Sequence, residues 1–503
     1  MTIYKFILNI LSFTIITAFF FKPFCSFANS KDIESWFKKA VLVKSYQQSY
    51  DWLNPWEKLE IRTKSGMALV VNIYNSKNKS TAFTTKTNKL YLLTTADMVT
   101  DATLIEISRK DFPRTFIAKI TLIDYAANIA LLDVDSFKFW EGLNPVNWDD
   151  AKPLKNSKKI KIDSLKIKSS EEWDIQSAEI EKMSIGYRLK SNAWFPQLKI
   201  VGISKASQGL PVIQDNKTVG MILKSNTQLA EAIPAEMILE FFKHSRNNSY
   251  FSLAHRGFNW KKLPQPSTAD YFQIPYKESG IWISRVFTFG TGSDVLKKGD
   301  FLTKIGEWPI SNEGKIKHPK WGISQFDLLF LDILKVGDFV QLNIIRNGKP
   351  TIINTKVSHY EGIIKPVPLE KVGHPPRFII NGGFLFQELT LNYLYMWGKN
   401  WKSRAPMRLR LFLEQNKAVD LHSIPMGISN KNSISALKDK NRVVLVTKVI
   451  PDEINIGYQN ISNAIVLKIN GKSIKTLSAV KDAFLYPKDN FHRIDFLPGS
   501  DRM

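Results

Sequence analysis

Histidine, the most common general base for activating a serine or cysteine nucleophile, is absent from the first 243 residues of this 503-residue chain. The single cysteine, Cys25, lies in an apolar N-terminal segment. A base must lie within hydrogen-bond reach of its nucleophile, so the first half of the chain cannot supply an imidazole base from its own residues. The sequence also predicts no metal site and no cofactor. All seven histidines lie further along the chain: His244, His255, His318, His359, His374, His422 and His492.

One tight turn in this first half nevertheless has the form of a nucleophile loop. In Lys205–Ile213 a polar run ends in a glycine and a proline, just before a β-prone run. Trypsin-like serine proteases have Gly-Asn-Ser-Gly-Gly-Pro at such a turn, and its backbone N–H groups form the oxyanion hole. Aligned on Pro211, Gln208 stands in place of the nucleophile and Ala206 in place of the first oxyanion glycine. A carboxamide cannot attack a carbonyl carbon, so the turn resembles the motif without its chemistry.

Two further stretches carry the same resemblance. Thr94–Val99 is similar to the Thr-Asn-Ala-His-Val-Val of HtrA/Deg-type proteases, with Asp97 in place of the general-base histidine. Ile123–Leu132 resembles the strand that carries the triad aspartate, with Asn128 in its place. Over about residues 41–497 the chain resembles the subgroup with one protease domain and two C-terminal PDZ domains. The resemblance implies a mainly β fold, a trypsin-like double β-barrel followed by two PDZ-like α+β domains.

The first PDZ-like unit is indicated by several pieces in the expected order. Arg256, Gly257, Phe258 and Asn259 stand where a PDZ domain has its carboxylate-binding loop. Leu296–Leu302 resembles the family's Leu-Lys-Pro-Gly-Asp-Val-Ile, and Asn347-Gly348 predicts a tight hairpin turn. PDZ domains bind an extended peptide as an added strand. The four loop residues are therefore predicted to bind a peptide C-terminus, with Arg256 adding positive charge.

The second PDZ-like unit has Asn381–Phe386 at the corresponding place, which predicts peptide contacts from Gly382, Gly383 and Phe384. An insertion at 391–417 contains Trp397, Trp401, Arg404, Arg408 and Arg410. Tryptophan and arginine are enriched at interface hot spots. We therefore expect the insertion to contact another domain or subunit, although helices that pack on their own domain also carry such residues.

The N-terminus has the form of an export signal. Lys5 precedes the apolar run Phe6–Phe21, and Ser26-Phe27-Ala28 supplies small residues for a cleavage site. Export to a periplasm or secretion is predicted, with an uncleaved membrane anchor as the alternative. The predicted boundaries are a signal peptide at 1–28, an N-terminal helix (31–44) and linker within 29–60, a protease domain at 61–245, and PDZ domains at 250–360 and 375–500.

The charge balance favours anionic partners. Lys and Arg total 70 against 46 acidic residues, a formal net charge of +24. No nucleic-acid motif accompanies this charge, and no nucleic acid is expected as a partner. Binding to a polyanion or a membrane surface remains one hypothesis, and scattered lysines on a soluble surface are the simpler explanation.

The favoured hypothesis is an exported pseudoprotease that binds C-terminal peptides or unfolded proteins, in protein quality control or as a scaffold. The resemblance implies a homo-oligomer, a trimer or a multiple of trimers, and an active protease paralogue is a further candidate partner. An active endopeptidase with relocated catalytic residues, using Ser207 as a shifted nucleophile, is the alternative. If the fold is retained, Asn128 and Gln208 are both expected to donate hydrogen bonds to Asp97.

Overall fold

The structure is a computed structural model that describes most of the chain beyond the expected signal segment, 1–28, which lies outside the described residues. Among the described residues no helix is both long and apolar enough to cross a membrane. The described residues are 30–73, 89–125, 127–149, 159–168, 172–188, 193–203, 206–246, 254–262, 266–271, 273–275, 277–287, 290–358, 367, 373–414 and 442–497.

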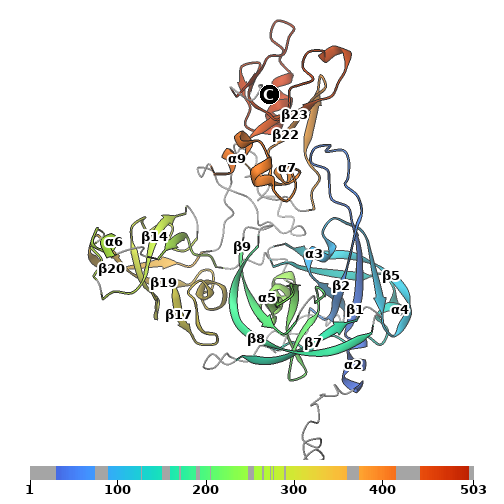
Figure 1. The fold of residues 1–503 in the computed structure, drawn as a ribbon, viewed down its shortest axis with the longest axis vertical. Coiled ribbons are helices and arrows are strands. Elements are labelled where there is room, and N and C mark those ends of the chain that lie inside the picture. The colour runs from blue at the N-terminus through green and yellow to red at the C-terminus, as the bar shows by residue number, and fades with distance from the viewer. Residues whose placement is uncertain are drawn as a thin grey trace, which may run out of the picture.

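The first six strands close into a barrel in the order β1-β2-β3-β6-β5-β4 (Figure 1). Apolar residues such as Val41, Leu92 and Ile107 fill it and are fully or almost fully buried. The elements are α2 (Ser30–Phe37), β1 (Ala40–Gln47), β2 (Arg62–Val71), β3 (Tyr91–Thr94), α3 (Ala96–Val99), β4 (Ala102–Arg109), β5 (Phe112–Asp124), β6 (Ile129–Val134) and α4 (Phe137–Trp140).

Strand β1 corrects one predicted boundary. The helix expected over 31–44 ends at Phe37, and β1 begins at Ala40 inside the predicted linker. Val41 and Val43 are buried in the barrel, and β1 pairs with both β2 and β4. β-Branched residues favour such a pleated, packed surface over a helix. The barrel domain therefore starts before residue 61.

The next six strands form a second closed barrel in the order β10-β11-β12-β9-β8-β7. One continuous core cluster contains Met67 and Leu131 of the first barrel together with Val212 and Met221 of the second. The two barrels therefore form one trypsin-like double-barrel unit. Its second half consists of β7 (Ile160–Ile167), β8 (Trp173–Arg188), β9 (Ala193–Val201), β10 (Pro211–Gln214), β11 (Lys217–Ser225), β12 (Leu229–Pro234) and α5 (Ala235–Arg246).

The first PDZ-like unit contains a sheet in the order β13-β14-β15-β19-β20, with β16 on β15. Asn347 and Gly348 both have positive φ and form the predicted turn between β19 and β20. The elements are β13 (Phe258–Lys261), α6 (Pro266–Tyr271), β14 (Ile281–Val286), β15 (Phe301–Ile305), β16 (Trp308–Pro309), β17 (Lys315–His318), β18 (Gly322–Gln325), the π-helix η1 (Leu329–Ile333), β19 (Phe339–Arg346) and β20 (Lys349–Lys356).

The second PDZ-like unit has the sheet order β21-β22-β23-β24-β25, with β26 on β24. If β22 corresponds to β13, the order β22-β23-β24 matches β13-β14-β15, and β21 is an additional edge strand. The elements are β21 (Phe378–Asn381), β22 (Phe384–Glu388), α7 (Leu391–Tyr395), α8 (Trp401–Arg404), α9 (Met407–Glu414), β23 (Val444–Val449), η2 (Glu453–Asn455), β24 (Ala464–Ile469), β25 (Lys472–Ser473), α11 (Leu477–Phe484) and β26 (Ile494–Phe496).

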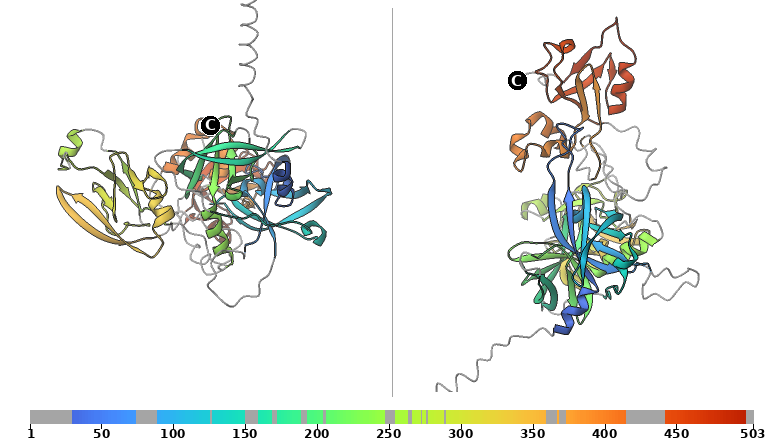
Figure 2. Two further views of the ribbon diagram at one scale, coloured as in Figure 1. Left: turned by 90° about the horizontal axis from the view of Figure 1, so that it is seen from below. Right: turned by 90° about the vertical axis from the view of Figure 1, so that its right-hand side faces the viewer.

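The connection between β1 and β2 reaches the second PDZ-like unit (Figures 1 and 2). Trp52 of this connection is 7% exposed and belongs to the same apolar cluster as Leu394 and Leu409 of the helical insertion. Nearby, the rings of Trp56 and Phe378 lie 5.9 Å apart. The insertion thus contacts the barrel domain, as expected.

Within the insertion, each of the two tryptophans has an aromatic neighbour. The ring of Trp397 lies 5.3 Å from that of Tyr393, and the ring of Trp401 lies 5.6 Å from that of Tyr395. Both tryptophans also pack against the apolar cluster that contains Trp52, so they take part in the predicted contact with another domain.

We predict that Trp52→Ala lowers the free energy of unfolding of the C-terminal unit by about 3 kcal/mol, because truncating a buried tryptophan leaves a cavity. Calorimetric unfolding of the full chain measures the effect. Trp56→Ala is the matched control, since Trp56 is 47% exposed and should cost much less. Equal shifts for the two variants would contradict the anchoring role of Trp52.

Candidate functional site

The fold brings the three degenerate triad positions to one site between the barrels. Asp97 lies in the first turn of α3, and Asn128 directly precedes β6. The backbone N–H of Asp97 donates to Oδ1 of Asn128 at 2.9 Å, and Nδ2 of Asn128 donates to Oδ2 of Asp97 at 3.1 Å. Asn128 is 5% exposed and has φ +57°, a left-handed conformation that asparagine tolerates better than most residues. The expected bond from Asn128 to Asp97 is therefore present.

Gln208 lies at the same site but has a different partner from the one expected. The hydroxyl of buried Thr95 donates to Oε1 of Gln208 at 3.2 Å. Among the described residues, Gln208 donates no hydrogen bond to Asp97. The prediction of two amide donors on Asp97 is wrong for Gln208. The amide oxygen instead provides an acceptor for Thr95, which would otherwise contribute a buried hydroxyl without one.

The turn that carries Gln208 is held by backbone contacts to both barrels. The carbonyl of Gln208 accepts from the N–H of Met67 at 2.9 Å, and the N–H of Gly209 donates to Ile222 at 2.9 Å. Gly209 has φ +85°, and a Cβ atom there would lie 1.9 Å from the Met67 carbonyl oxygen. Only glycine fits this close approach. The backbone of the turn is thus fixed by its contacts with both barrels.

Three polar side chains that the sequence analysis did not single out hold α3 in place. The carbonyl of Asp97 accepts from Lys64 Nζ at 2.8 Å and from Gln47 Nε2 at 3.0 Å. The next carbonyl, that of Met98, accepts from Gln47 Nε2 and from Ser45 Oγ. These donors come from β1 and β2, and no local motif marks them, because their role depends on how the barrel closes.

Tyr125 lies near this network and does not supply a base. Burial, together with the negative charges of Asp101 and Asp97, raises the pKa of Tyr125 to about 12. Its phenol therefore stays protonated at neutral pH. Asp97 is itself engaged by Asn128 rather than directed at a nucleophile.

The oxyanion-loop positions are Ala206 and Ser207. The carbonyl of Ala206 accepts from Ser225 Oγ at 2.9 Å. Within the described part of the chain, the hydroxyl of Ser207 has no hydrogen bond to Asp97, Asn128 or Gln208. A shifted Ser207 nucleophile would need such a contact to a base for activation.

In the first PDZ-like unit, the predicted loop leads into the edge strand β13. The N–H of Gly257 donates to the Thr291 carbonyl at 2.9 Å, and Phe258 is fully buried. Among the described strands, β13 has a neighbour on one edge only, β14. Arg256 forms an ion pair with Asp327, which the sequence analysis did not foresee.

In the second unit, the predicted peptide-binding loop is a hairpin turn. Gly382 has φ +56° and Gly383 has φ +80°, as the two central residues of a type I′ turn require. They join β21 to β22, and Phe384 pairs with Asn381 across the hairpin. β21 thus occupies the edge that corresponds to the open edge of β13. The prediction that Gly382, Gly383 and Phe384 bind a peptide stays a prediction, now for residues of a hairpin turn rather than of an open loop.

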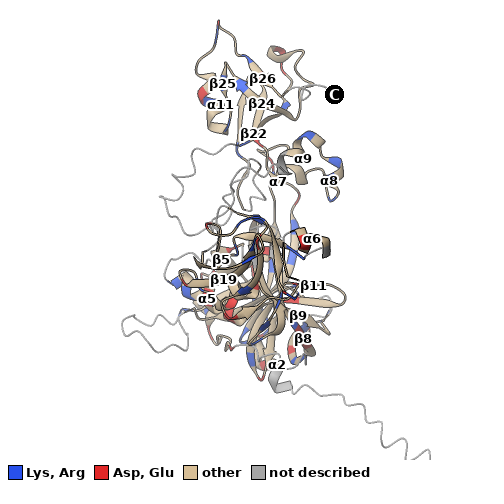
Figure 3. Ribbon diagram, turned by 90° about the vertical axis from the view of Figure 1, so that its left-hand side faces the viewer, with Lys and Arg blue, Asp and Glu red and all other residues tan. Residues whose placement is uncertain are grey.

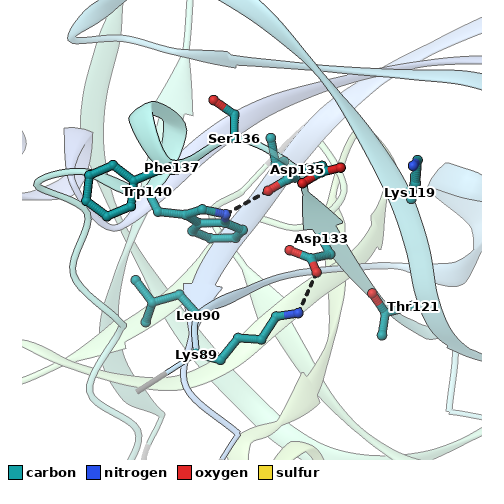
Figure 4. Close-up of a pocket in the computed structure, with 10 residues that line it drawn as sticks. Lys89, Leu90, Lys119, Thr121, Asp133, Asp135, Ser136, Phe137 and Trp140 are labelled. Carbon is teal, nitrogen blue, oxygen red and sulfur yellow. Dashed lines mark hydrogen bonds and ion pairs between the residues drawn. The ribbon is translucent and has the colours of Figure 1, made fainter. Parts of the chain in front are cut away.

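A surface cavity of about 630 Å³ lies on the first barrel, at the opposite end of β6 from Asn128 (Figure 4). Leu90, Phe137 and Trp140 form its apolar side, and Lys89 pairs with Asp133 at 2.7 Å on its polar side. Because it is separated from Asn128 by the length of β6, this cavity is not part of the triad site.

Comparison with known proteins identifies relatives over nearly the whole chain. Residues 367–501 match the PDZ domain family. The chain is 22% identical to the mitochondrial Do-like 11 protein of Arabidopsis thaliana over 444 residues, 87% of this chain and 66% of the relative. It is 22% identical to the chloroplastic protease Do-like 2 of the same plant over 475 residues, 92% of this chain and 70% of the relative. The chain thus spans about two thirds of the length of these relatives.

Among solved structures, the chain is similar to an HtrA-type protease, AlgW, determined with a decapeptide. The sequence identity is 14% and the TM-score is 0.45, with 66% of this chain and 98% of that chain covered.

We predict that Asp97→Ala lowers the free energy of unfolding of the double barrel by about 1–2 kcal/mol, because it removes the acceptor of a largely buried amide donor. Urea-induced unfolding measures the change. Asp133→Ala is a matched control, since its ion pair with Lys89 is solvent-exposed and should cost less than about 0.5 kcal/mol. An unchanged urea midpoint for Asp97→Ala would show that the network does not stabilise the fold.

Proposed function

We propose that this chain, a homologue of the HtrA/Deg-family proteases with a C-terminal PDZ domain, is a pseudoprotease that binds peptides. The observation that carries this proposal is the reciprocal hydrogen-bonded pair of Asp97 and Asn128, with Gln208 bound to Thr95 beside it. Each triad position is occupied by a group that serves another hydrogen bond. Asp97, at the position of the general base, accepts a hydrogen bond from the side-chain amide of Asn128. Gln208, a carboxamide, stands at the position of the nucleophile.

The size of the fall in turnover expected without a nucleophile and a base supports a non-catalytic role. Removing the serine nucleophile or the histidine base of a serine protease lowers turnover by about 10⁶-fold. The oxyanion hole and substrate binding account for only the remaining ~10³ to 10⁴-fold over water. A chain without the nucleophile and the base retains a binding cleft at most, and the active-endopeptidase alternative would need a base for Ser207.

Peptide binding is assigned to the first PDZ-like unit. The edge of β13 that faces away from β14 offers main-chain groups to an added strand, the usual mode of PDZ recognition. In the second unit β21 already pairs with the corresponding strand. We propose that peptides with a free C-terminus and an apolar last residue, including those of unfolded proteins, bind along β13.

The proposal extends to the location of the protein, its oligomeric state and the role of its basic surface. The N-terminal apolar run supports export, and the family resemblance supports a homo-oligomer that acts in quality control, alone or with an active paralogue. Figure 3 shows Lys and Arg spread over the described helices and strands, with Asp and Glu among them. This distribution favours a generally basic surface over one dedicated polyanion site.

We predict that the purified protein retains unfolded casein without cleaving it. Asp97→His alone and Gln208→Ser alone should stay inactive, because the first still has no nucleophile and the second still has no base. Casein retention on a column and cleavage on gels are measured on the same preparations. Cleavage by the unmodified protein that disappears in Ser207→Ala would instead establish the relocated-nucleophile alternative.

We also predict that Gly257→Ala abolishes calorimetric binding of an apolar C-terminal peptide. A Cβ atom at Gly257 would lie 2.7 Å from the Thr291 carbonyl oxygen and 2.9 Å from that of Gly290. It would therefore displace the loop before β13. Gly382→Ala is the comparison at the corresponding loop of the second unit, because a Cβ atom there meets nothing within 4 Å and only the positive φ of +56° is strained. Loss of binding in Gly382→Ala but not in Gly257→Ala would assign the peptide to the second unit.

A further inference from the structure

The open edge of β13 begins with the carbonyl of Phe258. Both backbone groups of Gly257 bond inward, its N–H to Thr291 and its carbonyl to the N–H of Phe287. The backbone groups of successive strand residues point to opposite edges. The N–H and the carbonyl of Phe258 therefore face the open edge, where an added strand would first pair.

That carbonyl already has a donor from the same chain. Nε of Arg256 donates to the Phe258 oxygen at 3.0 Å. Nη1 of the same guanidinium pairs with Oδ1 of Asp327, and the guanidinium carbon lies 5.8 Å from the centre of the Phe326 ring. The side chains of Arg256 and Asp327 are only 13% and 17% exposed. Burial lowers the pKa of Arg256 to about 10, so the guanidinium stays charged at neutral pH.

Asp327 is held over β13 by the residue before it. Phe326 is fully buried, and its ring stacks on that of Phe258 at 6.2 Å with an interplanar angle of 4°. The centre of the Phe326 ring also lies 5.7 Å from that of the Trp260 ring, in a T-shaped arrangement. These contacts fix the segment that precedes η1 against the start of β13. They place the carboxylate of Asp327 beside the loop 256–259, which was expected to bind the carboxylate of a peptide.

We propose that the Arg256–Asp327 ion pair is a latch on the first PDZ groove, and that the C-terminal carboxylate of a bound peptide displaces Asp327 from Arg256. This proposal rests on the peptide-binding function assigned above. Asp327 thereby sets the affinity of the groove, because the ligand must exchange one carboxylate for another on the same guanidinium. Release of Arg256 from the Phe258 carbonyl also frees that oxygen for a main-chain N–H of the peptide.

If the ion pair is a latch, removing the negative charge of Asp327 should raise the affinity of the first PDZ-like unit for a peptide. Asp327→Asn keeps the shape of the side chain but weakens its hold on Arg256. A decapeptide with an apolar C-terminal residue and a free carboxylate should bind this variant about five- to tenfold more tightly than the unmodified protein, in a calorimetric titration of the full chain. The same peptide with an amidated C-terminus should show a much smaller gain, because it cannot compete for Arg256.

Two further variants separate the latch from other effects. Asp332→Asn removes the same charge from η1, but Asp332 pairs with His318 rather than with Arg256, so its affinity should not change. Arg256→Gln removes the latch and the carboxylate partner together. It should therefore bind the free-acid and the amidated peptide with similar affinity. Thermal unfolding of each variant verifies that the fold is retained.

The outcomes are distinct. Unchanged or weaker binding of the free-acid peptide by folded Asp327→Asn, with normal binding by the unmodified protein, overturns the latch and leaves the proposed function intact. An equal gain in Asp332→Asn also overturns it, since the effect would then be one of net charge. If no variant binds either peptide, the assignment of peptide binding to this unit fails, and the latch fails with it.

Discussion

The close approach of two backbone segments between the barrels constrains the whole site. Met67 of β2 donates to the carbonyl of Gln208, and Gly209 leaves room for the Met67 carbonyl, which a Cβ atom would meet at 1.9 Å. These contacts join the halves of a single apolar core that includes Met67, Leu131 and Val212. Because the turn is part of the junction between the barrels, its backbone is needed for folding whether or not its side chains perform chemistry.

This constraint explains why the site keeps its backbone form whichever side chains it carries. The positions of Asp97 and Asn128 remain adjacent because α3 and the start of β6 are held by the same barrel. Polar groups enclosed at such a place need partners. The reciprocal bonds between Asp97 and Asn128, the bond from Thr95 to Gln208, and the donors Lys64 and Gln47 supply them. The polar groups at the three positions are thus held by one another and by residues of the first barrel.

The two PDZ-like units show how one strand order can give two different edges. In both, a core sheet places one strand at the position that receives ligands in PDZ recognition. In the second unit a two-residue turn at Gly382-Gly383 folds β21 back onto that strand. In the first, Arg256 and Asp327 lie at the open edge instead. The chain's own groups therefore occupy the two edges differently. A complete strand, β21, covers the edge in the second unit, and a single ion pair, Arg256–Asp327, lies at the edge in the first.

The sequence by itself determined the fold class and the residue types that stand at the three triad positions, Asp97, Asn128 and Gln208. These depend on residue identity and on short motifs, such as Thr94–Val99 and Lys205–Ile213, whose spacing is local. The predicted turn at Asn347-Gly348 is correct for the same reason, because positive φ at both residues is a local requirement.

The tertiary structure alone decided where the polar groups of these motifs find partners. Residues 40–47 were expected in a helix and linker, but they close a barrel because β2 and β4 pair with them. Gln208 turns to Thr95 rather than Asp97, and Gly382-Gly383 forms a hairpin rather than a carboxylate loop. Trp52 and Asp327 acquire their roles from segments distant in sequence. Hydrogen bonds and burial depend on neighbours in space, and a linear motif does not specify those neighbours.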